Sequence, residues 1–346
     1  MKTENNLMKK ICTYENAYDA YKKSRKIKKY NKEIIEFENN CEINLINGIK
    51  VLQNLSYTPG KYFVFKIWEP KERIIMALPF FDRVIQHMII NIIEPIFEKR
   101  FIEHSYACRK NKGVHSASKQ LSKWLYALEK INHKKIYCLS GDIHHYFQSV
   151  NHRILKNELR RYISDNQLLI ILDRIIDHNG IWPDGTGIPV GNLTSQIFAN
   201  VYLNKLDQYC KHDLHCKYYI RYMDNFLILN ENINKLKELK KLIEIFLNDK
   251  LKLQINPKST ILCAKNGIDF VGYRHWAGMT LLKKASMRRI NKLIKRLKNN
   301  EFEYISDFDK KMVSMMGHAI HADVYNYILS KIEEINKIKE KIINSN

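Results

Sequence analysis

Two runs of strand-forming residues, joined by an Asp-Asn pair, are the strongest structural constraint in this 346-residue chain. They lie between Tyr218 and Leu229, where aromatic and β-branched residues on both sides of Asp224 and Asn225 favour pleated strands. Asp and Asn tolerate the positive φ of a tight turn, so the stretch is predicted to be a β-hairpin. The carboxylate of Asp224 would then lie at the hairpin tip.

The excess of positive charge indicates the kind of partner. The chain has 58 Lys and Arg against 36 Asp and Glu, a formal net charge of +22, and such a field attracts polyanions. Nucleic acid is expected in preference to a membrane surface, because no apolar run approaches the roughly 18 residues of a spanning helix. The first residues lack the pattern of a signal peptide, and a cytoplasmic location is expected.

The cysteines favour a reducing compartment. There are seven, an odd number without a Cys-x-x-Cys pair, which argues against a disulfide framework. The segment from Cys210 to Cys216, with His212, Asp213 and His215, is either a zinc site or a polar connection between a helix and a strand. The connection is favoured, because structural zinc sites usually use separated ligand pairs.

A second carboxylate, Asp142, ends an apolar segment that begins at Ile136 and is predicted to be a strand. An acidic residue is unfavourable there unless it is solvated or bound to a cation, so Asp142 either caps a turn or binds a metal ion. Phe147 follows five residues later, as a wall for a nucleotide sugar or as a core aromatic. A helix is expected from about Asn151 to Arg161.

A glycine-punctuated loop from Gly185 to Gln196 precedes a helix predicted over 197–209, with Thr194 or Ser195 as its N-cap. Glycine allows a backbone to approach a ligand closely. The loop lacks both the Lys of a P-loop and a dinucleotide fingerprint. It is therefore not expected to be an ordinary nucleotide-binding turn.

The first third of the chain is predicted to contain helices and one basic hairpin. Residues 1 to about 60 have apolar residues at helical spacing, and a helix capped by Asp82 is expected to run to 101. Between them, strands are predicted over 62–68 and 73–78. Their hairpin either closes over a triphosphate or forms a solvated basic edge that blocks aggregation.

Two basic segments are candidate phosphate contacts. The loop 104–115 precedes a helix over about 116–130 and has a composition that often contacts phosphates. Strand-like segments at 251–260 and 268–276 precede the second, a helix with eight basic and no acidic residues between Lys283 and Lys298. Because its apolar residues share one face, the charged face is either solvated or a track for phosphates.

The order of these features resembles that of reverse transcriptases over nearly the whole chain. Within that family it is most similar to the enzymes of diversity-generating retroelements, because its loop has Gly-x-x-x-Ser-Gln where other reverse transcriptases more often have Gln-Gly and Ser-Pro. The segments that carry the resemblance are Glu69-Pro-Lys with Arg73 and Ala77-Leu78, Asp82-Arg-Val-Ile-Gln-His87, Tyr106-Ala-Cys-Arg109 with Lys112-Gly113, Gly187 to Gln196, Arg221-Tyr-Met-Asp224, Phe270-Val-Gly-Tyr273 and Gly317-His-Ala319.

The resemblance implies an α+β fold shaped like a right hand. It would comprise an N-terminal helical extension (1–60), fingers (61–132), a palm with an antiparallel sheet (133–280) and a helical thumb (281–346). Asp142 and Asp224 would lie on adjacent palm strands. With the backbone carbonyl of Ile143 they would bind two Mg²⁺ ions roughly 3.5 to 4 Å apart, with Mn²⁺ as the alternative ion.

The resemblance also implies roles for the residues around that centre. The metals would activate the primer 3′-hydroxyl and steady the triphosphate, with Lys258 as the candidate acid for pyrophosphate. The expected substrate-binding residues are Lys66, Lys71, Arg73, Phe147, Val190, Gly191 and Gln196. The expected nucleic-acid-binding residues are Arg109, Lys112, Tyr222, Gly272, Tyr273, Arg288, Arg289, Lys292, Lys295 and Arg296.

One position departs from the family pattern. The family has Tyr-x-Asp-Asp, whereas this chain has Asn225 after Asp224, which removes a negative charge from a site whose metal affinity depends on charge. The chain is then an active polymerase, an inactivated variant, or a natural pseudoenzyme that binds nucleic acid. Retained activity is favoured, because Asp142, Arg73 and Phe147 are present.

The function expected from the resemblance is RNA-directed DNA synthesis. The partners would be a structured noncoding RNA template, an RNA–DNA duplex, dNTPs and a small helical accessory protein. No RNase H or endonuclease domain is expected after the thumb. A mutagenic retroelement and an antiphage defence system are both open, and a non-catalytic RNA-binding scaffold is the alternative.

Overall fold

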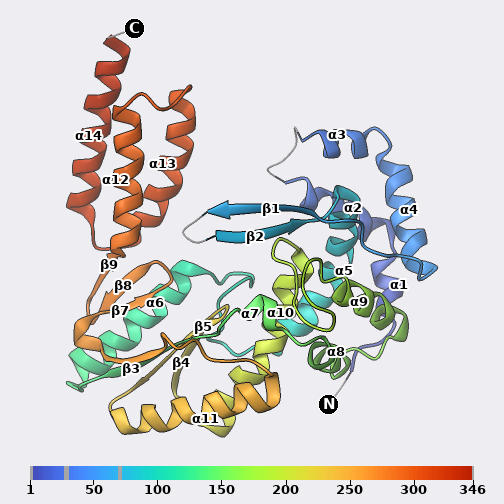
Figure 1. Ribbon diagram of the computed structural model, residues 1–346, viewed down its shortest axis with the longest axis horizontal. Coiled ribbons are helices and arrows are strands. Elements are labelled where there is room, and N and C mark those ends of the chain that lie inside the picture. The colour runs from blue at the N-terminus through green and yellow to red at the C-terminus, as the bar shows by residue number, and fades with distance from the viewer. Residues whose placement is uncertain (1–2, 27–30, 69–71, 345–346) are drawn as a thin grey trace.

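The computed structural model describes residues 3–26, 31–68 and 72–344, and it combines helices with antiparallel sheets, as the sequence predicted. Three C-terminal helices stand apart from the N-terminal helices, and a two-stranded hairpin extends between these two parts (Figure 1). A four-stranded sheet lies below them. Among the described residues, no helix is long and apolar enough to cross a membrane.

Four N-terminal helices cover one side of a long central helix. They are α1 (Leu7–Ile11), α2 (Tyr14–Ser24), α3 (Lys32–Glu38) and α4 (Cys41–Gln53), and the central helix is α5 (Phe80–Glu98). Their buried apolar residues, including Ile11, Ala20 and Leu45, join the largest hydrophobic core of the protein. The predicted amphipathic helices are therefore confirmed.

The helix α5 begins before Asp82, so the prediction that this residue is its cap is wrong. Asp82 lies inside the first turn, 5% exposed, where it accepts hydrogen bonds from the hydroxyl of Tyr57 at 2.8 Å and the amide of Gly60 at 3.2 Å. Burial raises the pKa of its carboxyl. These hydrogen bonds from Tyr57 and Gly60 hold the segment that leads into the hairpin against α5.

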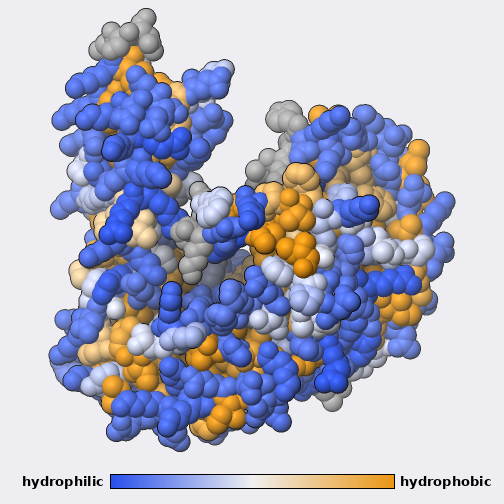
Figure 2. Space-filling model, in the orientation of Figure 1, coloured by the Kyte–Doolittle hydropathy of each residue, from blue (hydrophilic) through white to orange (hydrophobic). Residues whose placement is uncertain are grey.

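The hairpin β1 (Phe63–Trp68) and β2 (Glu72–Ala77) is antiparallel, with Phe63 opposite Ala77 and Trp68 opposite Glu72. Every residue of β1 is exposed. The hairpin points toward the C-terminal helices (Figure 1), and apolar side chains gather near its base (Figure 2). The predicted turn at 69–71, with Lys71, lies outside the described residues.

The four-stranded sheet, called the palm sheet below, contains β3 (Tyr137–Asp142), β4 (Tyr218–Tyr222), β5 (Asn225–Asn230) and β6 (Thr260–Cys263) in the antiparallel order β4-β5-β3-β6. Strand residues alternate between its faces. Leu139 and Ile228 belong to the large core with α11 (Ile233–Leu251), whereas Cys138 and Leu227 belong to a second core with α6 (Val114–Leu125).

Helices α7 (Tyr146–Ser149), α8 (His152–Arg160), α9 (Asn166–Asp177) and α10 (Leu193–Gln208) connect β3 to β4. Asn151 caps α8 by accepting the amide of Ile154, which confirms the predicted helix start. The predicted cap of α10 is wrong by two or three residues: Asn192 occupies the N-cap position. Thr194 and Ser195 are buried within the first turn.

The C-terminal part consists of a small sheet and three helices. The strands β7 (Ile268–Phe270), β8 (Tyr273–Trp276) and β9 (Met279–Leu282) confirm the segment predicted at 268–276, whereas most of 251–260 is a loop. The C-terminal bundle of α12 (Lys284–Lys298), α13 (Ile305–Ala319) and α14 (Tyr325–Asn344) has its own core. Ile290, Leu293, Ile294 and Leu297 of α12 enter it as the periodicity predicted.

Candidate active site

Two acidic residues meet at one end of the palm sheet. Asp142 is the last residue of β3 and pairs with Asn225, the first residue of β5. Asp224 immediately precedes Asn225, in the two-residue turn that joins β4 to β5. The sheet register therefore brings residues that are 82 positions apart in the sequence to adjacent strand ends, as predicted for a pair of metal-binding carboxylates.

The loop before β6 holds Asp142 in place. Its Oδ2 accepts a hydrogen bond from Nδ2 of Asn256 at 2.8 Å, and its backbone amide donates to Oγ of Ser259 at 3.0 Å. The backbone amide of Asn256 also donates to the carbonyl of Asp142 at 2.7 Å. Asn256 and Ser259 were missed as functional residues, although the Asn-Pro-Lys segment that begins at Asn256 and directly precedes Ser259 is a recognisable sequence feature.

The turn that carries Asp224 depends on a buried ion pair. Met223 has a positive φ of 53°, whereas Asp224 and Asn225 do not have a positive φ. The prediction that the Asp-Asn pair supplies the positive φ of the turn is therefore wrong. Arg221 donates to the carbonyl of Met223 at 2.8 Å and pairs with Asp207 of α10 at 2.6 Å, and both charged side chains are 0% exposed. Tyr219 also donates to Asp207 at 2.7 Å.

Asn225 lies beside the carboxylate it follows. Its side-chain Nδ2 donates a hydrogen bond to Oδ1 of Asp224 at 3.2 Å. The amide oxygen remains the only side-chain acceptor that Asn225 offers to a ligand. An Asp at this position would place a second negative charge there in place of a donor.

Burial and charge both act on Asp224. The pKa of its carboxyl is raised above the ordinary value of 3.8, first by desolvation and then by the nearby Asp142. The hydrogen bond from Asn225 and the charge of Arg73 act in the opposite direction. Because the charge of Asp142 disfavours the ionised form of Asp224, a bound cation would stabilise that form.

The donor set fits a hard divalent cation. Mg²⁺ is commonly held by one or two carboxylates together with substrate phosphates, and Asp142 and Asp224 are the two carboxylates here. The backbone carbonyl of Ile143 directly follows Asp142, at an isolated bridge to Ile255. Within the described ranges, no three His, Cys, Asp or Glu side chains form a metal-binding group, and this covers the segment from Cys210 to Cys216.

The hairpin and the glycine loop form one side of the site. The backbone amide of Met76 in β2 donates to the carbonyl of Val190 at 2.8 Å. Gly191, at φ +120°, lies so close to β2 that an added Cβ would be 3.0 Å from the Met76 oxygen. The glycine is therefore required for the loop to contact the hairpin that carries Arg73.

The remaining residues predicted to contact the substrate differ in exposure and in their protein partners. Phe147 is half-buried against the core, with its ring centroid 5.5 Å from that of Tyr146, and Gln196 is exposed in the first turn of α10. Lys66 forms an exposed ion pair with Glu72 at 2.6 Å. Lys258 is exposed in the turn after Asn256, whose Oδ1 accepts its backbone amide.

Two cations predicted to bind nucleic acid have protein partners in this structure. The side chain of Arg109 is 5% exposed, pairs with Glu98 at 2.7 Å and donates to the carbonyls of Ile102 and Ser105. Lys112 pairs with Glu103. Both side chains stabilise the 104–115 loop, and this assigns them a structural part in the present conformation.

The turn between β7 and β8 is joined to the C-terminal bundle. Tyr273 is buried, and its hydroxyl lies 2.9 Å from Nδ1 of His318 in α13 and 3.1 Å from Nδ1 of His115 in α6. Gly272, at φ +90°, has the His318 ring where an added Cβ would be, 2.9 Å from Nε2. His318 was noted only within the Gly-His-Ala segment, with no role assigned.

The charged face of α12 lies on the bundle surface. Arg288, Arg289, Lys292 and Lys295 are exposed, and no ion pair involves them among the described residues. Arg296 differs, because it pairs with Glu301 at 2.9 Å. Tyr222, the last residue of β4, is half-buried next to the turn of Asp224. A hollow separates the bundle from the N-terminal helices (Figure 2).

Comparison with known proteins gives a family match over the region that contains these features. Residues 68–275 match the family described as "Reverse transcriptase (RNA-dependent DNA polymerase)". The chain is 26% identical over 235 residues to Protein YkfC of Escherichia coli (strain K12), covering 56% of this chain and 60% of that protein. It is 24% identical over 171 residues to the group II intron-encoded protein LtrA of Lactococcus lactis subsp. cremoris, covering 46% and 27%.

The chain thus spans 60% or less of the length of these two relatives. Among solved structures, apo telomerase from Candida tropicalis is similar at 15% identity, with a TM-score of 0.49 and coverage of 84% of this chain and 58% of that one.

Proposed function

Because this chain belongs to the reverse transcriptase family, with a polymerase fold of the same kind, we propose that it synthesises DNA on a structured noncoding RNA template. The observation that carries the proposal is the meeting of Asp142 and Asp224 at adjacent strand ends. Its substrates are dNTPs and an RNA–DNA duplex. The proposed parts of the chain are an N-terminal extension (1–60), fingers (61–132), a palm (133–280) and a thumb (281–346).

The proposed cofactor is a pair of Mg²⁺ ions held by Asp142, Asp224 and the carbonyl of Ile143, with Mn²⁺ as a substitute. When bound, such ions lower the pKa of the attacking hydroxyl and offset the charge of the triphosphate. The chain's own part is to hold both carboxylates in position. Asn256 does this for Asp142, and Arg221 does it for the turn of Asp224.

The fingers hairpin and the glycine loop bind the incoming nucleotide in this proposal. Arg73 contacts the triphosphate, since its charge already acts on Asp224. Phe147 packs against the sugar and excludes a ribose 2′-hydroxyl, while Val190 and Gly191 pack on the new base pair. Lys258 donates a proton to the departing pyrophosphate.

The exposed cations of α12 bind the duplex backbone in this proposal, because they have no carboxylate partners of their own among the described residues. Gly272 and Tyr273 support the primer end. A small helical accessory protein and a cytoplasmic location complete the proposal. The closest functional class is the diversity-generating retroelement, with antiphage defence as the second.

Primer extension tests the proposal directly. The purified protein is incubated with an RNA template, a DNA primer, dNTPs and Mg²⁺, and labelled cDNA is measured; Asp142→Asn is the inactive control. We expect extension by the unmodified protein and more by Asn225→Asp, because the substitution restores a metal-binding charge. Failure of both proteins to extend any primer would overturn the proposed synthesis.

A second candidate function rests on Asn225 itself. An amide in place of a carboxylate beside Asp224 reduces the negative charge of the site, as expected of a protein that retains RNA binding without catalysis. Such a scaffold would bind its RNA with strong salt dependence, and Asp142→Ala would leave both this binding and the cellular phenotype intact. Loss of the phenotype in Asp142→Ala would exclude the scaffold and favour the polymerase.

A further inference from the structure

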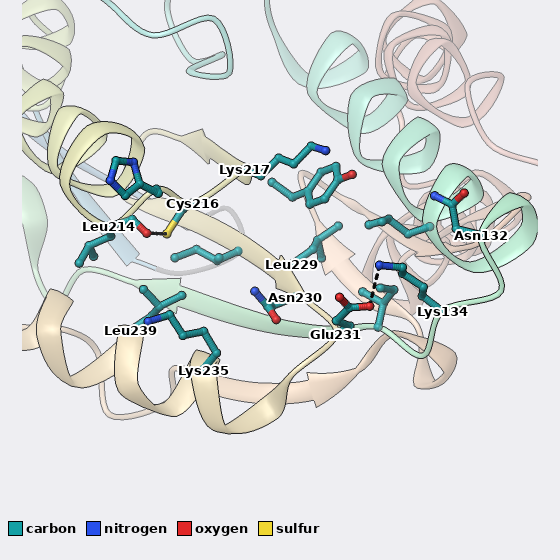
Figure 3. Close-up of a pocket in the computed structure, with 15 residues that line it drawn as sticks. Asn132, Lys134, Leu214, Cys216, Lys217, Leu229, Asn230, Glu231, Lys235 and Leu239 are labelled. Carbon is teal, nitrogen blue, oxygen red and sulfur yellow. Dashed lines mark hydrogen bonds and ion pairs between the residues drawn. The ribbon is translucent and has the colours of Figure 1, made fainter.

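The end of the palm sheet opposite Asp142 borders two cavities. One of about 480 Å³ lies between the segment after α6 and the turn from β8 to β9. The other, of about 360 Å³, lies beside β4 and β5 (Figure 3). Lys134 lines both cavities, so they are neighbours on the surface.

The sheet register separates this surface from the carboxylates. Asp142 is at one end of β3, and Tyr137, paired with Asn230 and Cys263, is at the other. At about 3.3 Å per strand residue, Lys135 is on the order of 20 Å from Asp142. The turn from β8 to β9 is likewise at the opposite end of its hairpin from Gly272. The cavities are therefore remote from the catalytic centre, and they lie at the other end of the short strand β8 from the proposed primer support.

The larger cavity is strongly basic. Its lining includes Lys130, His133, Lys134, Lys135 and Lys265, against the single acidic residue Glu129. All five basic residues are exposed. Lys134 has a partner, Glu231 at 2.8 Å, but that pair is solvent-exposed and binds weakly. Since like charges at close range are unfavourable, an anionic ligand would stabilise this arrangement.

An aromatic side chain is fixed among these lysines. Trp276 lines the cavity, and its Nε1 donates to the carbonyl of Lys265 at 3.2 Å. Arg274 lies over the indole, 5.5 Å from the ring centroid. Met279 also lines the cavity and is 41% exposed, and Tyr126, beside Gly278 in the turn from β8 to β9, is 51% exposed. Exposed apolar side chains in and beside a basic cavity distinguish this place from an ordinary solvated surface.

The smaller cavity has an apolar floor and a polar rim. Leu229 and Leu239 line it, and Lys217 and Lys235 lie at opposite edges, on different elements (Figure 3). Asn132 lies on the side toward the larger cavity. The combined surface, defined by Lys130, Lys134, Lys135, Lys217, Lys235, Lys265 and Trp276, is called the distal basic surface.

We infer that the distal basic surface is a second RNA-binding site, which holds an unpaired segment of RNA outside the catalytic cleft. The lysines would contact successive phosphates, and an unstacked base would lie on Trp276. Aromatic side chains set within basic grooves bind single strands in this way, because every base has a face that stacks. The inference rests on the proposed function, in which a structured RNA is the template.

An acidic protein segment is the rival ligand, and the aromatic content argues against it. Carboxylates would satisfy the lysines but would leave Trp276, Tyr126 and Met279 without a matching partner. A single-stranded RNA supplies both phosphates and stacking surfaces. The folded regions of the template RNA would then be held near the sheet while its template strand enters the cleft.

Fluorescence anisotropy with a labelled single-stranded RNA of mixed sequence tests the site in the full-length protein. An excess of a short, unlabelled RNA–DNA hybrid occupies the cleft. The test variants are Lys130→Glu/Lys265→Glu and Trp276→Ala. The control is Lys237→Glu/Lys241→Glu, which makes the same charge change on the exposed side of α11.

The double charge reversal should weaken probe binding at least tenfold at low salt and reduce the slope of log K against log salt by about 1.4, or 0.7 for each lost phosphate contact. Trp276→Ala should weaken it roughly fivefold or more, the range measured for loss of one base stack. Unchanged binding by both variants, equal loss in the control, or displacement of the RNA by poly-glutamate at matched charge would overturn the inference.

Primer extension on a simple RNA template, measured in the same preparations, separates this inference from the proposed function. We expect normal extension by all the variants, because the distal basic surface is remote from Asp142. Probe binding that depends on Trp276 without any primer extension would support the RNA site and count against the polymerase alone. Normal extension with unchanged probe binding would reject the RNA site alone.

Discussion

The carbonyl oxygen of Met223 accepts a hydrogen bond from Nη1 of Arg221 at 2.8 Å, directly before Asp224 in the chain. Met223 has a φ of 53°, which a non-glycine residue adopts only at a cost of about 1–3 kcal/mol. Arg221 is fixed in turn by Asp207 on α10. The position of the Asp224 carboxylate therefore depends on an ion pair that water does not reach.

Breaking this ion pair should destabilise the protein severely. Asp207→Asn leaves the Arg221 charge buried without its partner, and we expect a loss of about 3–5 kcal/mol in the free energy of unfolding. Urea titration monitored by circular dichroism measures it. The matched control is Glu238→Gln, which removes a carboxylate from the exposed pair with Lys235 and should cost less than about 1 kcal/mol. Equal effects of both substitutions would show that burial of the pair is unimportant.

Removing the charge of Asp224 should stabilise the metal-free protein while abolishing synthesis. A raised folded-state pKa means that the ionised form opposes folding, so the penalty is absent below the ordinary 3.8 and grows as pH rises through the folded value. Asp224→Asn should therefore raise the unfolding midpoint in EDTA at pH 7 by a few degrees, on the order of 2–4 °C per kcal/mol.

The difference between Asp224→Asn and the unmodified protein should shrink as the pH is lowered. Differential scanning fluorimetry across pH measures it, with the exposed Asp184→Asn as the control. A midpoint that falls at pH 7 in Asp224→Asn would contradict the proposed repulsion with Asp142.

Asn256, the loop residue that donates a hydrogen bond to Asp142, should affect how tightly the site binds Mg²⁺. Asn256→Ala removes the hydrogen bond to Oδ2, and loss of such a supporting contact typically costs 10–100-fold in metal affinity or activity. We expect a rise of that size in the Mg²⁺ concentration for half-maximal extension, with partial recovery at high Mg²⁺. The exposed Asn234→Ala provides the control, and an unchanged Mg²⁺ dependence would remove Asn256 from the site.

Local pattern and motif order were sufficient to predict the strand ends of Asp142 and Asp224, because each lies where an apolar run stops. They were insufficient for the partners of buried cations. Arg109 is predicted to bind phosphate, and the pattern gave no sign of its ion pair with Glu98 on the preceding helix. Sequence composition does not distinguish a guanidinium that meets a phosphate from one that meets a carboxylate, since both need the same donors. Only the packing of α5 against the loop decides between them.

The same reasoning explains the errors at helix starts. Asp82 and Thr194 have the side chains of N-caps, but the chain was already helical where each occurs. Asp82 instead accepts hydrogen bonds from Tyr57 and Gly60, which lie 25 and 22 residues earlier. Tertiary contacts of this kind leave no trace in a local pattern.

The junction between Gly272 and His318 should control how long the protein stays on its primer. Gly272→Ala places a methyl group 2.9 Å from Nε2 of His318 and forces alanine to φ +90°, so the C-terminal bundle must shift away from β8. We expect shorter products under single-encounter conditions with a heparin trap, while the addition of the first nucleotide is less affected. His318→Ala in the same protein removes the ring but not the backbone strain, and should restore part of the product length. If the double variant makes products as short as Gly272→Ala alone does, contact with the histidine is not the cause, and strain at position 272 accounts for the defect.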